Sequence, residues 1–299
     1  MFVLLGSNGQ ITSQLARLLL LAGGHAVRVV GRSAGALAPL QAAGAQVAAG
    51  DPTDAAFLQR AFAGATAVYT MTPPCYAEPD MRAAQDRIGT AVAQALRAAG
   101  VRRVVNLSSV GAELPSGTGP IAGLHAQERR LDAIDGLDLL HLRPGSFMEN
   151  LLPLTGAVAA MDALPGMESP EARIPMVATA DIAAVAAREL VTPQHRGVLV
   201  LHAPGSVTLR EAAALLGSAI GKPGLQYVQT SGADTKAMLR EQGFSADAAD
   251  QLEALAAWLS TSPLGSLAVA PAEVQPTTLD AFARGRFAAA YAEVAGQPA

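Results

Sequence analysis

Short apolar runs alternate with segments of helical periodicity through the first half of the chain. The runs predict six strands, at residues 2–5, 26–31, 45–50, 66–71, 101–109 and 137–145. The segments between them predict helices that end at Gly23, near Ala43, near residue 63, at Gly100 and near residue 133. Strands that alternate with helices at this pitch predict βαβ units, and therefore a parallel sheet with helices on both faces.

After Gly145 the alternation of strands and helices becomes less regular, and prolines interrupt it. The pattern predicts a helix over 180–191, a strand over 197–205 and a helix that begins with a capping box formed by Thr208 and Glu211. A further strand is expected at 225–229, and helices are expected near 232–242, near 246–259 and after Thr278. We therefore predict an α/β fold, a Rossmann-type doubly wound parallel sheet with a smaller mixed α/β C-terminal lobe. The domain boundaries are 1–150 and 151–299, with some later segments returning to the first domain.

Composition narrows the class of protein. Hydrophobic residues make up 51% of the 299 residues and the net charge is −4, which favours a globular protein and disfavours nucleic-acid binding. The apolar stretch around Arg17 is too short for a membrane span, and the N-terminus lacks the features of a signal peptide. The single cysteine, Cys75, fits a reducing compartment. A cytoplasmic location is expected, and a homodimer is an assembly that the sequence allows.

The loop after the first predicted strand has the spacing of a dinucleotide-binding fingerprint. Gly6 and Gly9 occupy the first two glycine positions, and Thr12 stands where a third glycine is usual. Because the loop follows a strand and opens a helix, its backbone N–H groups can approach a pyrophosphate. The alternative interpretation is an ordinary strand-to-helix turn.

The end of the second strand indicates which dinucleotide is preferred. An NAD site places an acidic residue there, whereas this chain has Arg32 and Ser33. An arginine can bind a 2′-phosphate with its guanidinium fork, and the Ser33 hydroxyl can add a donor, so NADP(H) is predicted over NAD(H). The alternative is a solvated surface arginine. Asp51, after the third strand, could reach the adenine amino group; the alternative is helix capping by Asp51 or Asp54.

The fourth and fifth strands end at Thr70–Pro73 and at Ser108-Ser109, where a nicotinamide would lie. Ser108 is a candidate to hydrogen-bond the cofactor or a substrate carbonyl, and the alternative is capping of the loop. No tyrosine is followed four residues later by a lysine, so standard alcohol–ketone chemistry is not expected. His125, three residues before Glu128 on one helical face, is a candidate donor or proton relay; the alternative is a solvated histidine. No metal-ligand spacing is found.

Several motifs occur in the order typical of one family: GSNGQIT, GRS, GDPTD, NLSS, HAQERRL, LRPGSFMENLL, ATADIAAVAARELV and PTTLDAF. The chain resembles NmrA-like proteins, atypical relatives of the short-chain dehydrogenases that include quinone and triphenylmethane reductases and NADPH-sensing regulators. The resemblance implies an extended Rossmann domain that binds NADP(H), with a cleft for substrate under the C-terminal lobe. It implies pyrophosphate binding by Gly6, Ser7, Asn8, Gly9, Gln10 and Ile11, and 2′-phosphate binding by Arg32. It also implies a ribose–nicotinamide site lined by Thr70, Met71, Thr72 and Pro73, with Pro144, Gly145 and Phe147 as its floor.

Two hypotheses for function follow. The first is an NADPH-dependent reductase that transfers a hydride to a quinone or similar conjugated small molecule, with Phe147, Met148 and Asn150 in the substrate cleft. Packing between the lobes is the alternative role for Phe147 and Met148. The second hypothesis is a non-catalytic NADP(H)-binding regulator, which the lack of a recognisable acid favours. A sugar-nucleotide epimerase or dehydratase is disfavoured by the missing Tyr–Lys pair.

Overall fold

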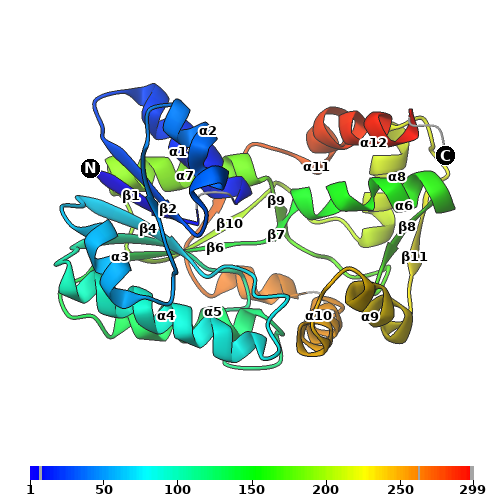
Figure 1. Ribbon diagram of the computed structural model, residues 1–299. Helices are drawn as coiled ribbons and strands as arrows, with labels where there is room; N and C mark the ends of the chain where they lie inside the picture. Colours follow the sequence, from blue (N-terminus) through cyan, green and yellow to red (C-terminus); the bar gives the residue numbers. More distant parts are fainter. Residues whose placement is uncertain (7–8, 262, 297–299) are drawn as a thin grey trace.

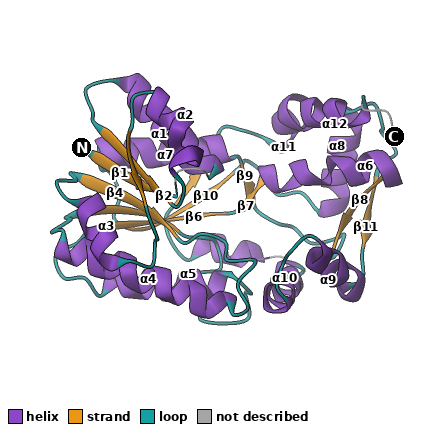
Figure 2. Ribbon diagram, viewed as in Figure 1, coloured by secondary structure: helices purple, strands orange, loops and turns teal. Residues whose placement is uncertain are grey.

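A single eight-stranded sheet forms the centre of the larger domain (Figures 1 and 2). The computed structural model describes residues 1–6, 9–261 and 263–296. Every strand pair in this sheet is parallel, and the strand order is β12-β10-β6-β5-β4-β1-β2-β3. The strands are β1 (Phe2–Leu5), β2 (Val27–Gly31), β3 (Gln46–Ala49), β4 (Ala67–Met71), β5 (Arg103–Leu107), β6 (Asp138–Pro144), β10 (Gly197–His202) and β12 (Ala272–Val274).

Helices cover both faces of the sheet, as predicted (Figure 1). One face packs on α1 (Gln10–Ala22), α2 (Ala34–Ala42) and α7 (Thr179–Val191), and the other on α3 (Ala55–Phe62), α4 (Met81–Ala98) and α5 (Ile121–Asp132). Successive strand residues alternate between the two cores: Leu4 belongs to the first, and Val3 and Leu5 to the second. Because both faces of the inner strands are buried, these strands read as continuous apolar runs rather than alternating ones.

The second half of the chain contributes to both parts of the molecule. α7, β10 and β12 return to the large domain, and β10 pairs directly with β6. The remainder forms the lobe, in which the predicted strand at 225–229 pairs with β8 and the predicted capping box of α8 is present. The lobe elements are β8 (Ala163–Gly166), β11 (Gln226–Gln229), α6 (Thr155–Met161), α8 (Leu209–Ala219), α9 (Gly232–Glu241), α10 (Ala246–Leu259), α11 (Leu279–Phe282), η3 (Ala283–Phe287) and α12 (Ala288–Ala295).

Two short segments connect the lobe to the large sheet. β7 (Ser146–Phe147) pairs in parallel with β9 (Met176–Val177), and the 3₁₀ segment η1 (Met148–Leu154) follows β7 directly. A second 3₁₀ segment, η2 (Pro263–Ala268), follows α10. The chain therefore leaves the sheet at β6 and enters the lobe within a few residues, which places the start of the lobe beside the carboxyl ends of the strands.

Predicted and observed helix boundaries differ mainly where a side chain caps the helix. The helix predicted from residues 78–80 begins at Met81, because the Asp80 carboxylate accepts a hydrogen bond from the Ala83 backbone N–H as an N-cap. The described residues contain no helix that is long and apolar enough to cross a membrane. Within the same ranges, no cluster of histidine, cysteine and acidic side chains has the arrangement of a metal site.

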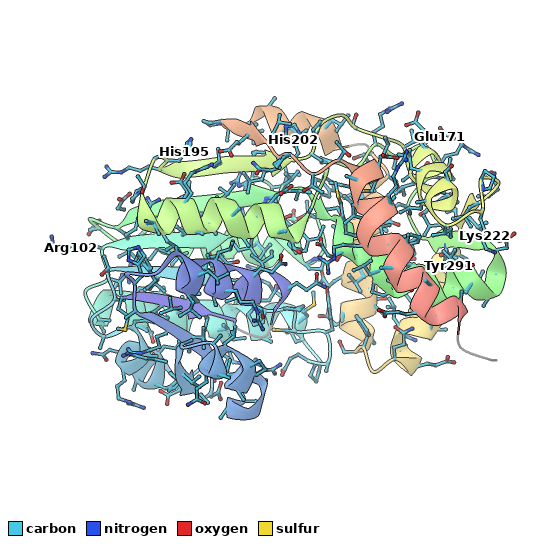
Figure 3. All side chains as sticks on the ribbon, turned by 90° about the horizontal axis from the view of Figure 1, so that it is seen from above. Arg102, Glu171, His195, His202, Lys222 and Tyr291 are labelled. Atoms are coloured by element: carbon cyan, nitrogen blue, oxygen red, sulfur yellow. The ribbon has the colours of Figure 1, made fainter. Side chains whose placement is uncertain are left out.

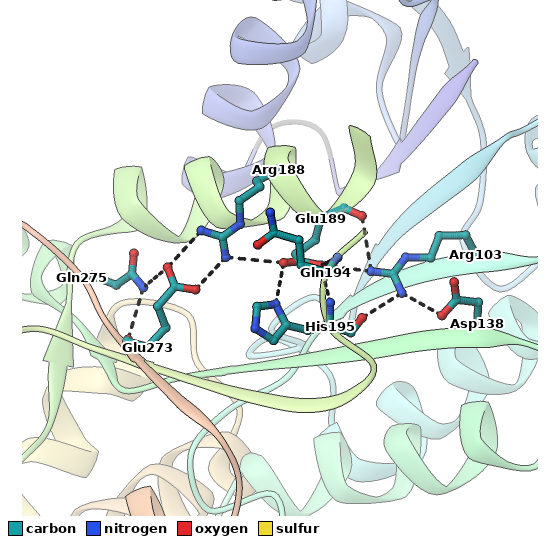
Figure 4. Close-up of polar contacts among 8 residues, drawn as sticks. All are labelled: Arg103, Asp138, Arg188, Glu189, Gln194, His195, Glu273 and Gln275. Carbon is teal, nitrogen blue, oxygen red and sulfur yellow. Dashed lines mark hydrogen bonds and ion pairs between the residues drawn. The ribbon is translucent and has the colours of Figure 1, made fainter. Parts of the chain in front are cut away.

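A network of buried charges joins α7 to the amino ends of the strands (Figure 4). The Glu189 carboxylate has no exposed surface and contacts Arg103 at the start of β5 and His195 just before β10. Arg103 also forms an ion pair with Asp138, the first residue of β6, at 2.9 Å. The network therefore lies at the edge of the sheet opposite the strand ends where ligands bind in folds of this type.

Candidate functional site

The strand order places a crevice between β1 and β4. The chain continues from β1 to β2 on one side, whereas β4, β5 and β6 extend the sheet on the other side. In doubly wound sheets, ligands bind outside the carboxyl ends of the strands at such a reversal. The loops that follow β1 and β4 therefore frame the candidate site.

The loop after β1 requires its first glycine. Gly6 has a φ of +87°, and a Cβ atom on it would lie 2.6 Å from Met71 Sδ at the end of β4. Gly9 is the N-cap of α1, and its N–H donates to the Gly6 carbonyl at 3.0 Å. Both features bring the loop close to the neighbouring strand and point the start of α1 at the crevice.

The remaining loop residues divide between surface and core. Gln10 is exposed, whereas the Ile11 side chain is buried in the core under α1, so only its backbone can face a phosphate. Thr12 replaces the usual third glycine; it is buried, and its hydroxyl lies 3.5 Å from the Leu5 carbonyl, which accepts its hydrogen bond. The predicted pyrophosphate ligands Ser7 and Asn8 lie outside the described residues.

A small pocket opens at the ends of β2 and β3. Its lining comes from the ends of β1, β2, β3 and β4 and from helices α3 and α4, and includes Gly6, Arg32 and Gly50. The Arg32 side chain is exposed, and among the described residues it has neither a hydrogen-bond nor an ion-pair partner. An exposed guanidinium beside a pocket can bind a phosphate without first breaking an ion pair.

Ser33 and Asp51 take part in local turns near this pocket. The Ser33 hydroxyl oxygen accepts from the Ala36 N–H as the N-cap of α2, which leaves its O–H able to donate. Helix α3 is capped by Asp54, which was one of the alternatives, while Asp51 accepts bonds from the backbone and hydroxyl of Thr53, both at 2.8 Å. These two hydrogen bonds hold the pKa of Asp51 below its usual value, so it is a carboxylate beside Arg32.

A second cavity lies between the strand ends and the lobe and has a volume of about 280 Å³. Its walls are mostly apolar. Its lining comprises Met71, Thr72, Pro73, Pro74, Tyr76, Met81, Gln85, Leu107, Ser108, Ser109, Val110, Pro120, Ile121, Leu124, Gly145, Ser146, Phe147, Asn150, Ile174, Pro175, Leu255, Trp258 and Leu259. Apolar walls with a few polar groups are typical of pockets for small molecules and cofactors.

Ser108 is the polar group of this lining that most clearly points to a ligand. It is 3% exposed, and its Oγ has no hydrogen-bond partner among the described residues. Leaving a buried hydroxyl unpaired costs about 1–3 kcal/mol, which a bound carbonyl or hydroxyl would offset. Ser109 differs, because its hydroxyl donates to the Val110 carbonyl at 2.9 Å.

The described lining of the cavity omits four residues that the sequence assigned to the catalytic, nicotinamide or substrate site: Thr70, Pro144, Met148 and His125. Thr70 is buried in the sheet and donates to the Asn106 side chain at 3.0 Å. Pro144 is buried at the end of β6, where its carbonyl accepts from the Val110 N–H, and Met148 packs in the core of the lobe. Met148 therefore packs within the lobe, whereas the alternative predicted for it was packing between the lobes.

His125 is tied to the loop between β5 and α5. Its Nδ1 lies 2.8 Å from the Ala112 carbonyl, which can only accept, so Nδ1 carries the proton and donates. His125 is not part of the described lining of the cavity, although Ile121 and Leu124 of the same helix are. Its predicted neighbour Glu128 is buried and contacts Arg143 through both carboxylate oxygens, at 2.6 and 2.9 Å.

Several lining residues were not predicted from the sequence. The most notable are Leu255, Trp258 and Leu259 of α10, which close the cavity from the lobe. Their spacing of three and four residues marks one face of a helix, but it gives no information on what that face contacts. Tyr76 was also missed; burial raises the pKa of its hydroxyl, which makes it a weak acid.

Neither lysine of the chain lies in the described cavity lining. Lys222 forms an ion pair with Asp162 at 2.5 Å, and Figure 3 shows it beside Tyr291 at the end of the lobe remote from His195. Lys236 forms ion pairs with Asp250 and Glu253. A lysine-assisted proton transfer in the cavity is therefore not supported.

The comparison with known families decides the class of this site. The model of a family described as NAD(P)H-binding matches residues 6–193, well over half of the chain. The chain belongs to this NAD(P)H-binding family. The NAD(P)H azoreductase of Xenophilus azovorans is 30% identical over 260 residues, which are 86% of this chain and 87% of the azoreductase. This chain therefore belongs, with the azoreductase, to an NAD(P)H-dependent reductase family.

Solved structures share the fold of this NAD(P)H-binding protein. The NADPH-dependent quinone oxidoreductase QOR2 of Escherichia coli, complexed with NADPH, superposes with a TM-score of 0.78 at 25% identity, covering 96% of this chain and 100% of QOR2. The triphenylmethane reductase of Citrobacter sp., complexed with NADP(H), has a TM-score of 0.78 at 20% identity, with 96% and 100% coverage. The transcriptional regulator NmrA, in complex with NADP, has a TM-score of 0.70 at 14% identity, with 96% and 95% coverage. The resemblance to the NmrA-like family and the Rossmann-type fold are thereby confirmed.

Proposed function

We propose that this protein is an NADPH-dependent reductase whose acceptor is a quinone or a similar conjugated small molecule. The observation that carries the proposal is the apolar cavity at the carboxyl ends of β4 and β5, into which the buried Ser108 hydroxyl brings an unpartnered polar group. The QOR2 and azoreductase relatives reduce acceptors of this conjugated type according to their names, which supports the acceptor class.

The residues present fit a nicotinamide dinucleotide. Gly6 and the amino end of α1 would hold the pyrophosphate, and Met71, Thr72 and Pro73 would contact the ribose–nicotinamide half. The close approach of Gly6 to Met71 supports this, because a side chain there would fill the cradle. When bound, the reduced nicotinamide supplies a hydride.

The side chains of the cavity have simple roles in this proposal. The apolar walls exclude water and orient the acceptor, and the Ser108 hydroxyl donates a hydrogen bond to an acceptor carbonyl oxygen. A quinone that gains a hydride becomes a hydroquinone anion, which water can protonate. A tuned acid is therefore unnecessary, which agrees with a lining in which, among the described residues, the acidic group is the weakly acidic Tyr76.

A preference for NADP(H) over NAD(H) forms part of the proposal. Arg32 stands at the end of β2, where an NAD site has an acidic residue, and its guanidinium is exposed. Hydrogen bonds to charged groups contribute about 1.5–3 kcal/mol, and exposure favours the lower end of that range. We therefore expect Arg32→Ala to weaken NADPH binding by about 10- to 30-fold.

The test has two arms on one protein sample. NADPH and NADH are titrated by nicotinamide fluorescence, with Arg32→Ala as the variant and Arg60→Ala, another exposed arginine, as its control. A panel of quinones is then added while the absorbance of the reduced nicotinamide is followed. Preferential NADPH binding that is lost in Arg32→Ala but kept in Arg60→Ala, with quinone-dependent oxidation, supports the proposal.

The second candidate function is a non-catalytic NADP(H)-binding regulator. It is favoured by the absence, from the described lining, of an acid with a suitable pKa. Tight NADPH binding without oxidation by any acceptor would support it over the reductase, and no dinucleotide binding would contradict both. A cytoplasmic location and a homodimer stay predictions.

A further inference from the structure

The lobe closes the cavity with one face of α10. This face lines the same cavity as Ser108, although it lies well over 100 residues later in the sequence; its residues are Leu255, Trp258 and Leu259. The Trp258 side chain is half-buried, so part of its surface remains available to a ligand. The wall opposite the strand ends is therefore aromatic and aliphatic.

Glycines in the β5–α5 loop allow this close approach. Gly111 has a φ of +92°, and a Cβ atom there would lie 2.5 Å from Cη2 of Trp258. Gly119 has a φ of +55°, and a Cβ atom there would collide with the backbone carbonyl of Gln251 on α10. Both glycines therefore contact α10 closely, and the tip of the Trp258 indole rests on the loop that follows Ser108. This contact fixes the position of the indole relative to the strand ends.

The indole suits one kind of ligand. Its flat apolar ring stacks on planar aromatic molecules, and an aromatic pair of this kind contributes about 0.5–1.5 kcal/mol beyond the burial of area. An aliphatic acceptor of similar reactivity gains no such contribution. The contribution corresponds to roughly a two- to tenfold difference in affinity.

We propose that Trp258 is the specificity-determining wall of the acceptor site and selects planar aromatic acceptors over non-aromatic conjugated ones. The selection of acceptors rests on the proposed reductase function, whereas the contact between Trp258 and an aromatic ligand does not. The discrimination acts on binding, because the same contact is made before and during hydride transfer.

Fluorescence tests the contact without turnover. Trp258 is the single tryptophan of the chain, so its emission reports on the cavity alone. Menadione is titrated into the cofactor-free protein, and cyclohexenone serves as the non-aromatic probe. The expected result is saturable quenching by menadione. The control is the double variant Trp258→Phe, Tyr291→Trp, which moves the fluorophore to the far end of the lobe and should show only linear, collisional quenching.

Kinetics test the selection. Trp258→Leu is expected to raise KM for menadione three- to tenfold and to leave kcat, the KM for NADPH and the KM for cyclohexenone within twofold. Trp258→Phe should recover most of the affinity for menadione. Met238→Leu, an exposed apolar residue on α9, is the unaffected control.

The outcomes separate the two proposals. Saturable quenching without turnover of any acceptor supports the Trp258 wall and contradicts the reductase function. Non-saturable quenching in the wild-type protein overturns the Trp258 inference even if quinones are reduced. An equal rise in KM for both acceptors, or a fall in kcat alone, also overturns it, because either result shows that the indole supports the lobe rather than the ligand.

Discussion

The buried carboxylate of Glu189 offers a test of what stabilises the large domain. Its Oε2 accepts from the backbone N–H groups of Gln194 at 2.9 Å and His195 at 3.1 Å, and from Arg103 at 3.4 Å. Its Oε1 accepts from His195 Nδ1 at 2.8 Å and from Arg188 at 3.4 Å (Figure 4). The carboxylate thus accepts hydrogen bonds from two backbone N–H groups of the turn between α7 and β10, and it also neutralises the buried Arg103 guanidinium.

Glu189→Ala removes all five contacts. The Arg103 guanidinium, whose side chain is 7% exposed, would keep Asp138 as its one charged partner among the described residues. Removing one member of a buried ion pair costs about 3–5 kcal/mol, because the remaining charge stays desolvated. We expect the free energy of unfolding to fall by about that amount. Glu189→Gln keeps the volume and one acceptor oxygen, so its loss should be smaller.

The pH dependence of this contribution has a definite sign. Burial opposes ionisation of Glu189, but the hydrogen bonds from Gln194 and His195 outweigh it and hold the pKa of the carboxyl below its usual value. A lowered pKa in the folded state stabilises the protein above the unfolded-state pKa of about 4.3, and this stability is lost as the pH falls through the folded-state pKa. The difference in stability between wild type and Glu189→Gln should therefore shrink as the pH falls below about 4.

Urea unfolding followed by far-UV circular dichroism measures these differences. The matched control is Glu171→Ala, which breaks an exposed ion pair with Arg210 and should cost no more than about 1 kcal/mol. Because the network lies at the amino ends of the strands, the KM for NADPH should not change in the Glu189 variants. A loss for Glu189→Ala that is no larger than that of the control would refute the reasoning.

Three further substitutions test the site. Ser108→Ala should lower kcat/KM for a quinone by up to about tenfold without lowering the free energy of unfolding, because its hydroxyl has no hydrogen-bond partner among the described residues. Steady-state kinetics measure the first quantity and urea unfolding the second, and an unchanged kcat/KM would contradict the role assigned to Ser108. Gly6→Ala should weaken NADPH binding at least about tenfold in a fluorescence titration, whereas Gly24→Ala, with a similar φ but open space, should not. Gly111→Ala should lower the Tm and raise the KM for an aromatic acceptor more than Gly117→Ala does, because Gly117 has a positive φ but no neighbour within 4 Å.

The elements of the large domain could be predicted because their signals are local. The inner strands, such as β1 and β4, are short apolar runs buried on both faces, and most of the helices packed on them carry an apolar face. The predicted strand at 225–229 and the capping box at Thr208 were found for the same reason. Helix starts were less accurate where a single carboxylate, such as Asp80, decides the first turn.

Site residues were predictable only where the chain direction fixes their place. Gly6, Arg32 and Ser108 lie just after strands, and Met71 ends one. Because the carboxyl ends of parallel strands meet at one edge, the convergence of these residues follows from the order of the elements. Thr70 and Met148 stand one residue from positions that line the cavity. Thr70 faces elsewhere because neighbouring residues of a strand point to opposite sides, and Met148 does so because it begins the 3₁₀ segment η1, whose first residue cannot be located from the sequence.

The sequence by itself determined the fold class, the dinucleotide loop and the lack of a Tyr–Lys pair, because each depends on residues close together in the chain or on composition. Only the tertiary structure decided that α10 closes the cavity, that Ser108 rather than Ser109 keeps an unpartnered hydroxyl, and that Glu128 pairs with Arg143 rather than with His125. These facts depend on contacts between segments distant in sequence. Such contacts are set when whole faces of helices and sheets pack together. An apolar stripe in the sequence indicates that a face is buried, but it does not indicate which element covers that face.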